Sequence, residues 1–333
     1  MKRFVTTTLI LFATLEASAK VTALDTVSIP VRDLERSIAF YTTVLDFKHI
    51  ATTELAGDDI EQALGLFGVR AKIAKLRLGD ESLELIQFLA PEGRPYPEDA
   101  RSNDRSFQHV AIIVSDMAKA YARLRQNNVR HASSGPQRLP DWNPTASGIE
   151  AFYFKDPDGH PLEILAFPKG KGAEKWQRKD KLFLGIDHTA IVISSTTAST
   201  NFYGTTLGMT KAGESENYGT EQEHLNNVFG ARLHITAMRA AAGPGVEFLE
   251  YLAPAGGRPA PADRRTNDLA AVTTVLVSND VQADATSLRA QGYDWVSPGT
   301  VTLNDQSLGY AKAATLEDPD GHLIRLVQGA DKK

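Results

Sequence analysis

An internal repeat covers almost the whole chain of 333 residues and limits the folds that it can adopt. Phe40–Tyr41 recurs as Phe202–Tyr203, and the pentapeptide Asp156–His160 recurs as Asp318–His322, in both cases 162 residues later. Two further matches have offsets of 163 and 164 residues: Leu89–Pro91 with Leu252–Pro254, and Asn103–Asp104 with Asn267–Asp268. Such small changes of offset indicate two copies of one module whose loops differ by single residues.

The repeat also predicts the domain organisation. We expect a first module over residues 20–168 and a second module over residues 183–330. The intervening residues 169–182 are rich in Lys, Gly and Glu and lack an apolar periodicity, which is typical of a linker.

Residues 1–19 have the pattern of a secretory signal peptide. A basic start, Met1–Arg3, precedes a short apolar stretch, and Ala17–Ala19 forms a small-residue cleavage site. The apolar stretch is too short to span a bilayer. We therefore expect a mature protein that begins near Lys20, is periplasmic or secreted, and has no membrane association after cleavage.

The composition excludes several classes of function. The net charge is −5, from 36 Lys and Arg against 41 Asp and Glu, whereas a nucleic-acid partner requires clustered basic residues. The chain has no Cys, so any metal must be held by nitrogen and oxygen ligands. Nucleophile-elbow, P-loop and H-E-x-x-H motifs are all missing. We expect a small-molecule substrate and no nucleic acid.

Each module itself consists of two similar halves. An apolar segment such as His109–Val114 predicts a strand, and Asp116 is suited to cap a helix over Met117–Gln126. Short strands follow, and the last two form a hairpin around Asp156–Gly159, whose Pro and Gly favour a tight turn. The predicted fold is α+β, with four βαβββ units.

This arrangement resembles the vicinal oxygen chelate superfamily, which contains glyoxalase I, extradiol dioxygenases and fosfomycin-resistance proteins. The resemblance rests on Phe-Tyr followed by Leu45–Phe47 or Leu207–Met209, and on D-P-D-G-H before the last strand, and it covers about residues 22–330. It implies two vicinal-oxygen-chelate modules in one chain. In that superfamily two βαβββ units form a cup around one divalent metal, whose ligands come from the first and last strands of each unit.

Eight residues occupy the positions that the resemblance assigns to metal ligands. The first-strand positions hold Thr26, His109, His188 and Thr273, and the last-strand positions hold Glu84, Glu163, Glu247 and Arg325. Only the second and third units therefore keep both a His and a Glu. Pairing of units across the modules creates one complete site, of His109, Glu163, His188 and Glu247. Pairing within each module creates two incomplete sites.

We favour the crossed pairing, because the two units that lack a His-Glu pair, the first and the fourth, then share one cup. In that cup Arg325 could form an internal ion pair with Glu84. A third possibility is that both sites have lost metal binding and that the remaining His and Glu residues are structural. The complete set suits one divalent ion, Fe(II), Mn, Ni, Co or Zn, with two positions open for adjacent substrate oxygens. The resemblance implies a metal-stabilised enediolate, with Glu163 or Glu247 as the proton shuttle.

Two further residues are candidates for the same cup. Tyr153 lies three residues before Asp156, where fosfomycin-resistance relatives point a side chain into the cup. It is either a hydrogen-bond donor to substrate or a packed aromatic. His234, on a predicted middle strand of the third unit, is a weaker candidate.

Three functions remain open. The four-ligand set favours an isomerase or lyase of the glyoxalase/epimerase type, although glutathione as a cosubstrate is doubtful for an exported protein. A non-haem iron dioxygenase generally uses two His and one carboxylate, so Glu247 counts against it unless it is displaced. A protein that sequesters a ligand without turnover is the third. The chain is expected to be a monomer with pseudo-dimer symmetry, or a homodimer.

Overall fold

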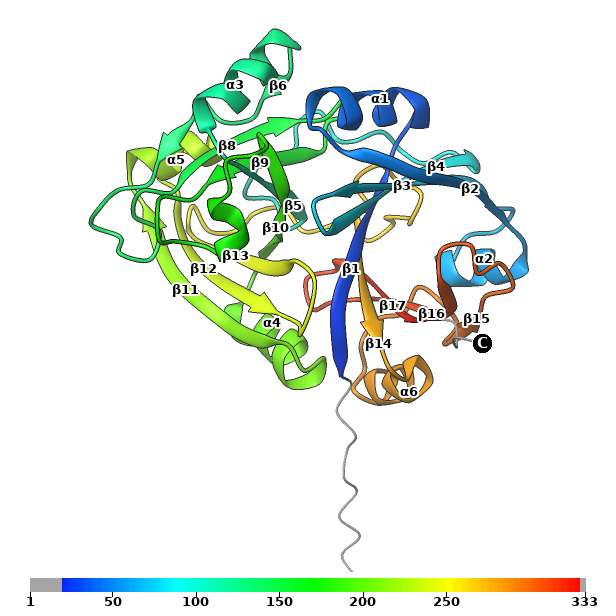
Figure 1. Cartoon of the computed structure of the whole chain (residues 1–333). Coiled ribbons are helices and arrows are strands. Elements are labelled where there is room, and N and C mark those ends of the chain that lie inside the picture. The colour runs from blue at the N-terminus through cyan, green and yellow to red at the C-terminus, as the bar shows by residue number, and fades with distance from the viewer. Residues whose placement is uncertain (1–19, 330–333) are drawn as a thin grey trace, which may run out of the picture.

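The computed structural model describes residues 20–329, so the predicted signal peptide lies outside the described residues. Two large sheets dominate the molecule, and each sheet contains strands from both copies of the repeated module. Figure 1 shows one half coloured green to yellow, and another half in which blue N-terminal segments lie beside orange and red C-terminal segments.

The eight-stranded sheet joins the first and fourth units in the order β15-β16-β17-β14-β1-β4-β3-β2. Strands β1 and β14 meet antiparallel at its centre, where Val27 lies opposite Thr274. The first unit contains β1 (Val21–Pro30), α1 (Leu34–Val44), β2 (Lys48–Ala56), α2 (Asp58–Leu64), β3 (Arg70–Leu78) and β4 (Glu81–Ala90). The fourth contains β14 (Thr273–Ser278), α6 (Val281–Ala290), β15 (Val301–Thr302), β16 (Tyr310–Glu317) and β17 (Leu323–Gly329).

The nine-stranded sheet joins the second and third units in the order β11-β12-β13-β10-β5-β9-β8-β6, with β7 paired to β8. The second unit contains β5 (Phe107–Val114), α3 (Met117–Gln126), β6 (Arg130–His131), β7 (Gln137–Arg138), β8 (Glu150–Lys155) and β9 (Pro161–Ala166). The third contains β10 (Phe183–Ile193), α4 (Thr196–Thr200), the π-helical turn η2 (Asn201–Thr206), β11 (Thr210–Tyr218), α5 (Thr220–Asn226), β12 (Arg232–Arg239) and β13 (Gly245–Ala253).

This topology confirms the crossed pairing of the units. Strand β5 of the first module pairs antiparallel with β10 of the second, and β1 pairs with β14 in the same way. Each sheet therefore contains strands of both modules. A cup formed by either sheet is shared between the modules and cannot be completed by one of them alone.

The units depart from the simple predicted pattern in three places. Short helices α2 and α5 precede the third strand of the first and third units, and each ends at a residue with positive φ, Gly65 or Asn227. In the second unit β6 and β7 have only two residues each. The linker forms a 3-10 turn, η1 (Glu174–Gln177), which buries Trp176. Helix α3 has the predicted span, and Asp116 caps it by accepting from the amide of Lys119 at 3.0 Å.

The two repeated signatures stabilise each other. The carboxylate of Asp156 accepts from the amides of Gly159 and His160 in its own turn, at 2.8 and 2.9 Å. The Tyr41 hydroxyl of helix α1 donates to the same carboxylate at 3.4 Å, and Tyr203 donates to Asp318 at 3.0 Å. Both carboxylates and both tyrosines are buried, so each signature satisfies a polar group of the other.

Two symmetric clasps hold the modules together. Arg94 of the first module contacts the buried carboxylate of Asp268, with 2.6 Å between Nη2 and Oδ2. Arg258 of the second module contacts Asp104 at 2.7 Å in the same way. Both guanidiniums also donate through Nε to the same carboxylate. Arg258 thereby binds both oxygens of Asp104, whereas Nε and Nη2 of Arg94 both donate to Oδ2 of Asp268.

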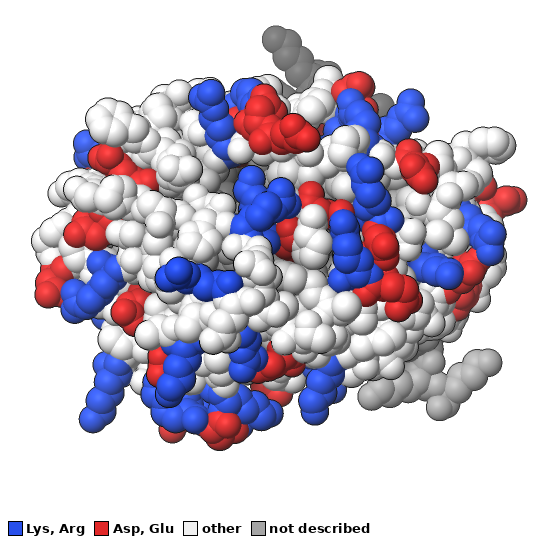
Figure 2. Space-filling view, turned by 90° about the horizontal axis from the view of Figure 1, so that it is seen from above, with Lys and Arg blue, Asp and Glu red and all other residues white. Residues whose placement is uncertain are grey.

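The outer surface carries charges of both signs. On the face shown in Figure 2, basic and acidic side chains are intermingled. Among residues 20–329, no helix is long and apolar enough to cross a membrane.

Candidate metal centre

Strand register places the predicted ligands on one surface of the nine-stranded sheet. Glu163 lies opposite Ala111, two residues after His109, and Glu247 lies opposite Ala190, two residues after His188. Residues two apart on a strand point to the same face, so each Glu shares a face with its His. The antiparallel contact of β5 and β10 pairs His109 with Ala190 and His188 with Ala111. This contact brings the two pairs together.

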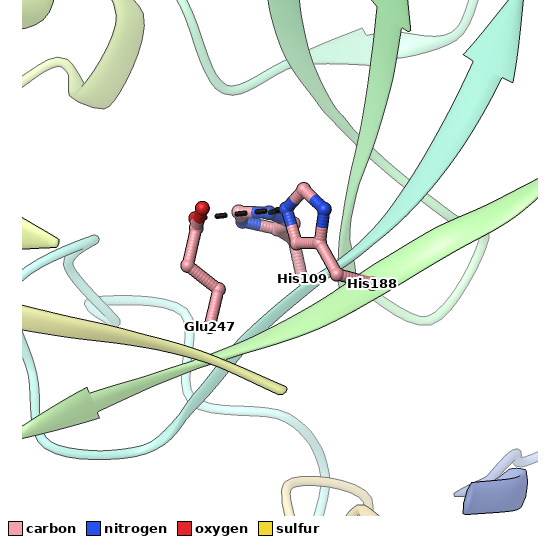
Figure 3. A group of neighbouring side chains, drawn as sticks. All are labelled: His109, His188 and Glu247. Carbon is pink, nitrogen blue, oxygen red and sulfur yellow. Dashed lines mark hydrogen bonds and ion pairs between the residues drawn. The ribbon is translucent and has the colours of Figure 1, made fainter. Parts of the chain in front are cut away.

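Three of the four side chains, those of His109, His188 and Glu247, converge on one point, and Glu163 lies beside the two histidines. Nε2 of His109 lies 3.4 Å from Nε2 of His188, and Nε2 of His188 lies 3.5 Å from Oε2 of Glu247. These three residues offer ligand atoms within 4.8 Å of one another, and Figure 3 shows them pointing toward one another. Oε2 of Glu163 completes the set, at 3.1 Å from His109 and 3.8 Å from His188.

The donor set fits a divalent cation. Oε2 of Glu163 is fully buried and accepts no hydrogen bond, although it lies beside two imidazoles. A buried carboxylate oxygen without a donor is costly, and facing imidazole nitrogens cannot satisfy one another unless one of them is protonated. Two imidazoles and two carboxylates are ligands that Fe(II), Mn, Ni, Co and Zn accept. The chemistry of the site therefore matches the predicted ion class.

Two residues that the sequence analysis did not select orient the histidines. Asp187 Oδ2 accepts from Nδ1 of His188 at 3.0 Å, and Oε1 of Gln108 contacts Nδ1 of His109. Each is the extra residue of a β-bulge, because the register slips between Ile186 and His188 and again at Gln108. The bulge lets a residue adjacent in sequence reach the ring from the side away from the ligand atom.

A chain of hydrogen bonds fixes Asp187 in turn. The indole of Trp176, in the linker, donates to its Oδ1 at 2.8 Å, and Arg239 donates to Oδ2 at 2.8 Å. The linker thus contributes to the site. The sequence carries a signal for this residue, since an Asp precedes the ligand position in both copies of the repeat, as Asp187 before His188 and as Asp25 before Thr26.

The electrostatics of the site favour a cation. Burial opposes protonation of His188, but Glu247, Asp187 and Glu163 outweigh it and raise the pKa of His188 to about 9. Burial raises the pKa of Glu247, against the lowering effect of the histidines. Burial also opposes ionisation of Asp187, but His188, Arg239 and Trp176 lower its pKa. A proton on His188 therefore occupies the place that a metal would take.

Tyr153 lies in the cup and His234 does not. Tyr153 on β8 is opposite Glu163, and its ring centroid lies 4.9 Å from that of His109. Its side chain is buried, and within residues 20–329 its hydroxyl makes no hydrogen bond. His234 is three residues from Ala237, the partner of Glu247, so it faces the opposite side of the sheet. The candidacy of His234 was therefore wrong.

The eight-stranded sheet repeats the geometry without the ligands. Glu84 lies opposite Ser28, and Arg325 lies opposite Val275, which reproduces the register of the other sheet. Glu84 and Arg325 influence each other's pKa, yet no ion pair within 4.0 Å joins them, so the predicted direct contact is wrong. Among the described residues, the group around His109 is the one cluster of three or more potential metal ligands.

Comparison with known proteins agrees with this architecture. The model of the Glyoxalase/Bleomycin resistance protein/Dioxygenase superfamily matches residues 23–164 and again residues 185–326. A lactoylglutathione lyase of Salmonella typhimurium is 33% identical over 147 residues, which are 43% of this chain and 91% of that enzyme. A lactoylglutathione lyase of Escherichia coli is 28% identical over 136 residues, 40% of this chain and 85% of that enzyme.

Two solved structures share the fold over nearly the whole chain. Glyoxalase I of Zea mays has a TM-score of 0.59 at 17% identity and covers 92% of both chains. A putative dioxygenase of Bacillus subtilis has a TM-score of 0.57 at 15% identity, covering 94% of this chain and 86% of that one. Both likenesses support the arrangement of two modules in one chain.

Proposed function

Because this chain belongs to the Glyoxalase/Bleomycin resistance protein/Dioxygenase superfamily, we propose that it is a divalent-metal-dependent isomerase or lyase of the glyoxalase type. Its substrate is a small molecule with adjacent oxygen atoms. The observation that supports this proposal most strongly is the cluster of His109, His188 and Glu247 in one of the two cups, with Glu163 beside both histidines. Similarity to lactoylglutathione lyases agrees with a lyase.

The four side chains would hold the ion through imidazole nitrogens and carboxylate oxygens. A divalent ion bound there supplies a Lewis acid for two adjacent oxygens of the substrate. Asp187 and Gln108 keep Nε2 of each histidine aimed at the centre. We assign to Tyr153, whose hydroxyl has no partner among the described residues, the donation of a hydrogen bond to a substrate oxygen; its ring beside that of His109 supports this role.

We assign the proton-shuttle role to Glu247 rather than Glu163. The side chain of Glu247 is 21% exposed, whereas that of Glu163 is 4% exposed. Glu247 also lies farther from its nearest imidazole, at 3.5 Å against 3.1 Å. A base that removes a proton from carbon and returns it must move and must meet the substrate. Glu163 is better suited to hold the ion in place.

The test begins with purified protein loaded separately with Fe(II), Mn, Ni, Co or Zn. Each form is assayed with substrates that carry adjacent oxygens, including the hemithioacetal of methylglyoxal and glutathione, and exchange of the substrate's carbon-bound proton with solvent is followed by NMR. We expect isomerase or lyase turnover, loss of that exchange in Glu247→Gln, and retained ion binding in that variant.

Three results would contradict the proposal. Oxygen uptake with catechols would establish a dioxygenase. Tight binding without turnover of any substrate would establish a ligand-sequestering protein. Proton exchange lost in Glu163→Gln but retained in Glu247→Gln would reverse the two glutamate roles.

A further inference from the structure

The turn between β3 and β4, in the sheet without a complete ligand set, lies against β10 of the other sheet, and β3 and β10 are in contact. Two glycines allow this approach. Gly79 lies in the turn, and a Cβ there would come within 2.4 Å of the carbonyl oxygen of Leu184. Gly185 lies on β10, and a Cβ there would come within 2.3 Å of Oε2 of Glu81. The two sheets therefore touch directly at the strand that carries His188.

Glu81, the first residue of β4, satisfies a backbone group next to the bulge of β10. It is 6% exposed, its Oε2 accepts from the amide of Ile186 at 3.2 Å, and its Oε1 accepts from Nζ of Lys175. The repeat supplies a comparison, because Leu24 matches Ile186. The amide of Leu24 donates instead to the backbone carbonyl of Ala242, at 3.1 Å. A carboxylate thus replaces this backbone contact only in the sheet that contains the candidate metal centre.

The linker extends this contact to the metal centre. Nζ of Lys175 lies 4.4 Å from the ring centroid of Trp176. The side chain of Trp176 is buried, and its indole donates to Oδ1 of Asp187 at 2.8 Å. Asp187 in turn accepts from Nδ1 of His188. A chain of contacts therefore joins Glu81 of one sheet to a predicted metal ligand of the other.

Trp176 has a distinct role among the partners of Asp187. Oδ2 of Asp187 accepts from both His188 and Arg239. Within residues 20–329, Oδ1 accepts a hydrogen bond from the indole alone. A carboxylate that is fixed through both oxygens keeps one orientation, and the ring that donates to it keeps one direction. Loss of the indole N–H would leave the plane of this carboxylate, and with it the ring of His188, less well defined.

On the basis of the metal centre in the proposed function, we propose that Glu81 and Trp176 are positioning residues for that centre. Glu81 fixes the backbone at Ile186, immediately before the bulge, and holds Lys175 against the indole. Trp176 fixes the carboxylate that orients His188. The eight-stranded sheet, which lacks a complete ligand set, thereby increases the metal affinity of the nine-stranded sheet.

The test measures metal binding by the whole protein in the absence of substrate. Competition with a chromophoric chelator gives the Zn(II) affinity, and the visible absorption of the Co(II)-loaded protein reports the ligand geometry. Trp176→Phe keeps an aromatic ring and removes the indole N–H, and Glu81→Gln keeps the shape of the side chain and removes its charge. We expect each substitution to weaken Zn(II) binding about tenfold or more and to shift the Co(II) absorption bands, because the partners behind a metal ligand contribute about 10- to 100-fold.

Two matched substitutions in the other half serve as controls. Trp295→Phe removes an indole N–H that is buried without a partner among the described residues. Glu84→Gln changes another buried carboxylate of β4, whose oxygens have no hydrogen-bond partner in the same part of the chain. Both variants should keep the wild-type affinity and the wild-type Co(II) spectrum. Thermal unfolding of every variant without metal verifies that it is folded, so that lost affinity reports on the metal centre.

Asp187→Asn tests whether Trp176 acts through this carboxylate. In that background Trp176→Phe should cause little further loss of affinity, because the group that the indole positions is already changed. Losses of affinity that multiply in the double variant would overturn the role of Trp176.

Wild-type affinity and spectrum in both Glu81→Gln and Trp176→Phe would overturn the proposal. A wild-type protein that binds neither Zn(II) nor Co(II) would refute the metal centre itself, and these roles with it. Metal binding that both substitutions weaken, in a protein that converts no substrate, would support these roles and refute only the proposed catalysis.

Discussion

Asp187 and His188 are adjacent in sequence, yet the Asp187 carboxylate accepts from Nδ1 of His188 at 3.0 Å while Nε2 of the same ring faces His109. Consecutive strand residues normally point to opposite faces, and the bulge in β10 removes that restriction. The carboxylate therefore fixes both the ring orientation and the tautomer that presents a lone pair to the metal.

The first prediction concerns this carboxylate. Asp187→Asn should weaken metal binding about 10- to 100-fold, because an amide supports the required tautomer less well than a carboxylate. Competition with a chromophoric chelator measures the dissociation constant. Asp25→Asn is the matched control, since Asp25 occupies the equivalent bulge of the other sheet. Equal effects of the two substitutions on metal affinity would refute the assigned role of Asp187.

The second prediction is the stoichiometry of one catalytic ion per chain. His109→Ala and His188→Ala should each lose most of the metal, because each removes one of four donors from a shared site. Thr26→Ala and Thr273→Ala change the equivalent positions of the other cup and should leave the metal content at one. Elemental analysis of the purified variants decides the matter. Two equivalents, each lost in a different variant, would be incompatible with a single shared site.

The third prediction links metal binding to pH. His188 has a pKa of about 9 in the metal-free site, above its ordinary value, so it carries a proton at pH 7. A metal needs the neutral ring and must displace that proton. Apparent metal affinity should therefore rise about tenfold per pH unit from pH 6 to 8 and level off above about 9.

Calorimetry in buffers of different ionisation enthalpy counts the protons released on metal binding. We expect about one proton per ion at pH 7 from His188. Affinity that stays constant between pH 6 and 8 would show that His188 is already neutral in the free protein.

The fourth prediction concerns the clasp between the modules. Arg94→Met should destabilise the protein by about 1–3 kcal/mol, because the buried carboxylate of Asp268 loses the two hydrogen bonds that Nε and Nη2 of Arg94 donate to its Oδ2. Arg70→Met is the control, since Arg70 and Glu54 are both substantially exposed and such pairs contribute about 0–1 kcal/mol. Urea unfolding followed by circular dichroism measures both. An Arg94 effect no larger than the control would mean that water replaces the guanidinium without loss.

The repeat in the sequence determined much of this fold. Four equivalent units follow from local patterns: Asp116 caps its helix as predicted, and D-P-D-G forms its turn, because these preferences depend on neighbouring residues. The ligand positions also follow from the repeat, since strand alternation is local. Helices α2 and α5 were missed because they are short and lie between strands whose pattern dominates the sequence.

Only the tertiary structure decided which units share a cup. Within-module and crossed pairing use the same strands. The choice between them depends on the pairing of β5 with β10, which are distant in the sequence, and no local sequence pattern encodes that pairing. The same contacts bring Trp176 and Asp187 to the metal centre. In the other sheet, where β1 meets β14, Glu84 and Arg325 affect each other's pKa without forming the ion pair that their residue types alone suggested. Side-chain chemistry is encoded locally, but the distance between two charges is set by the packing of the whole sheet.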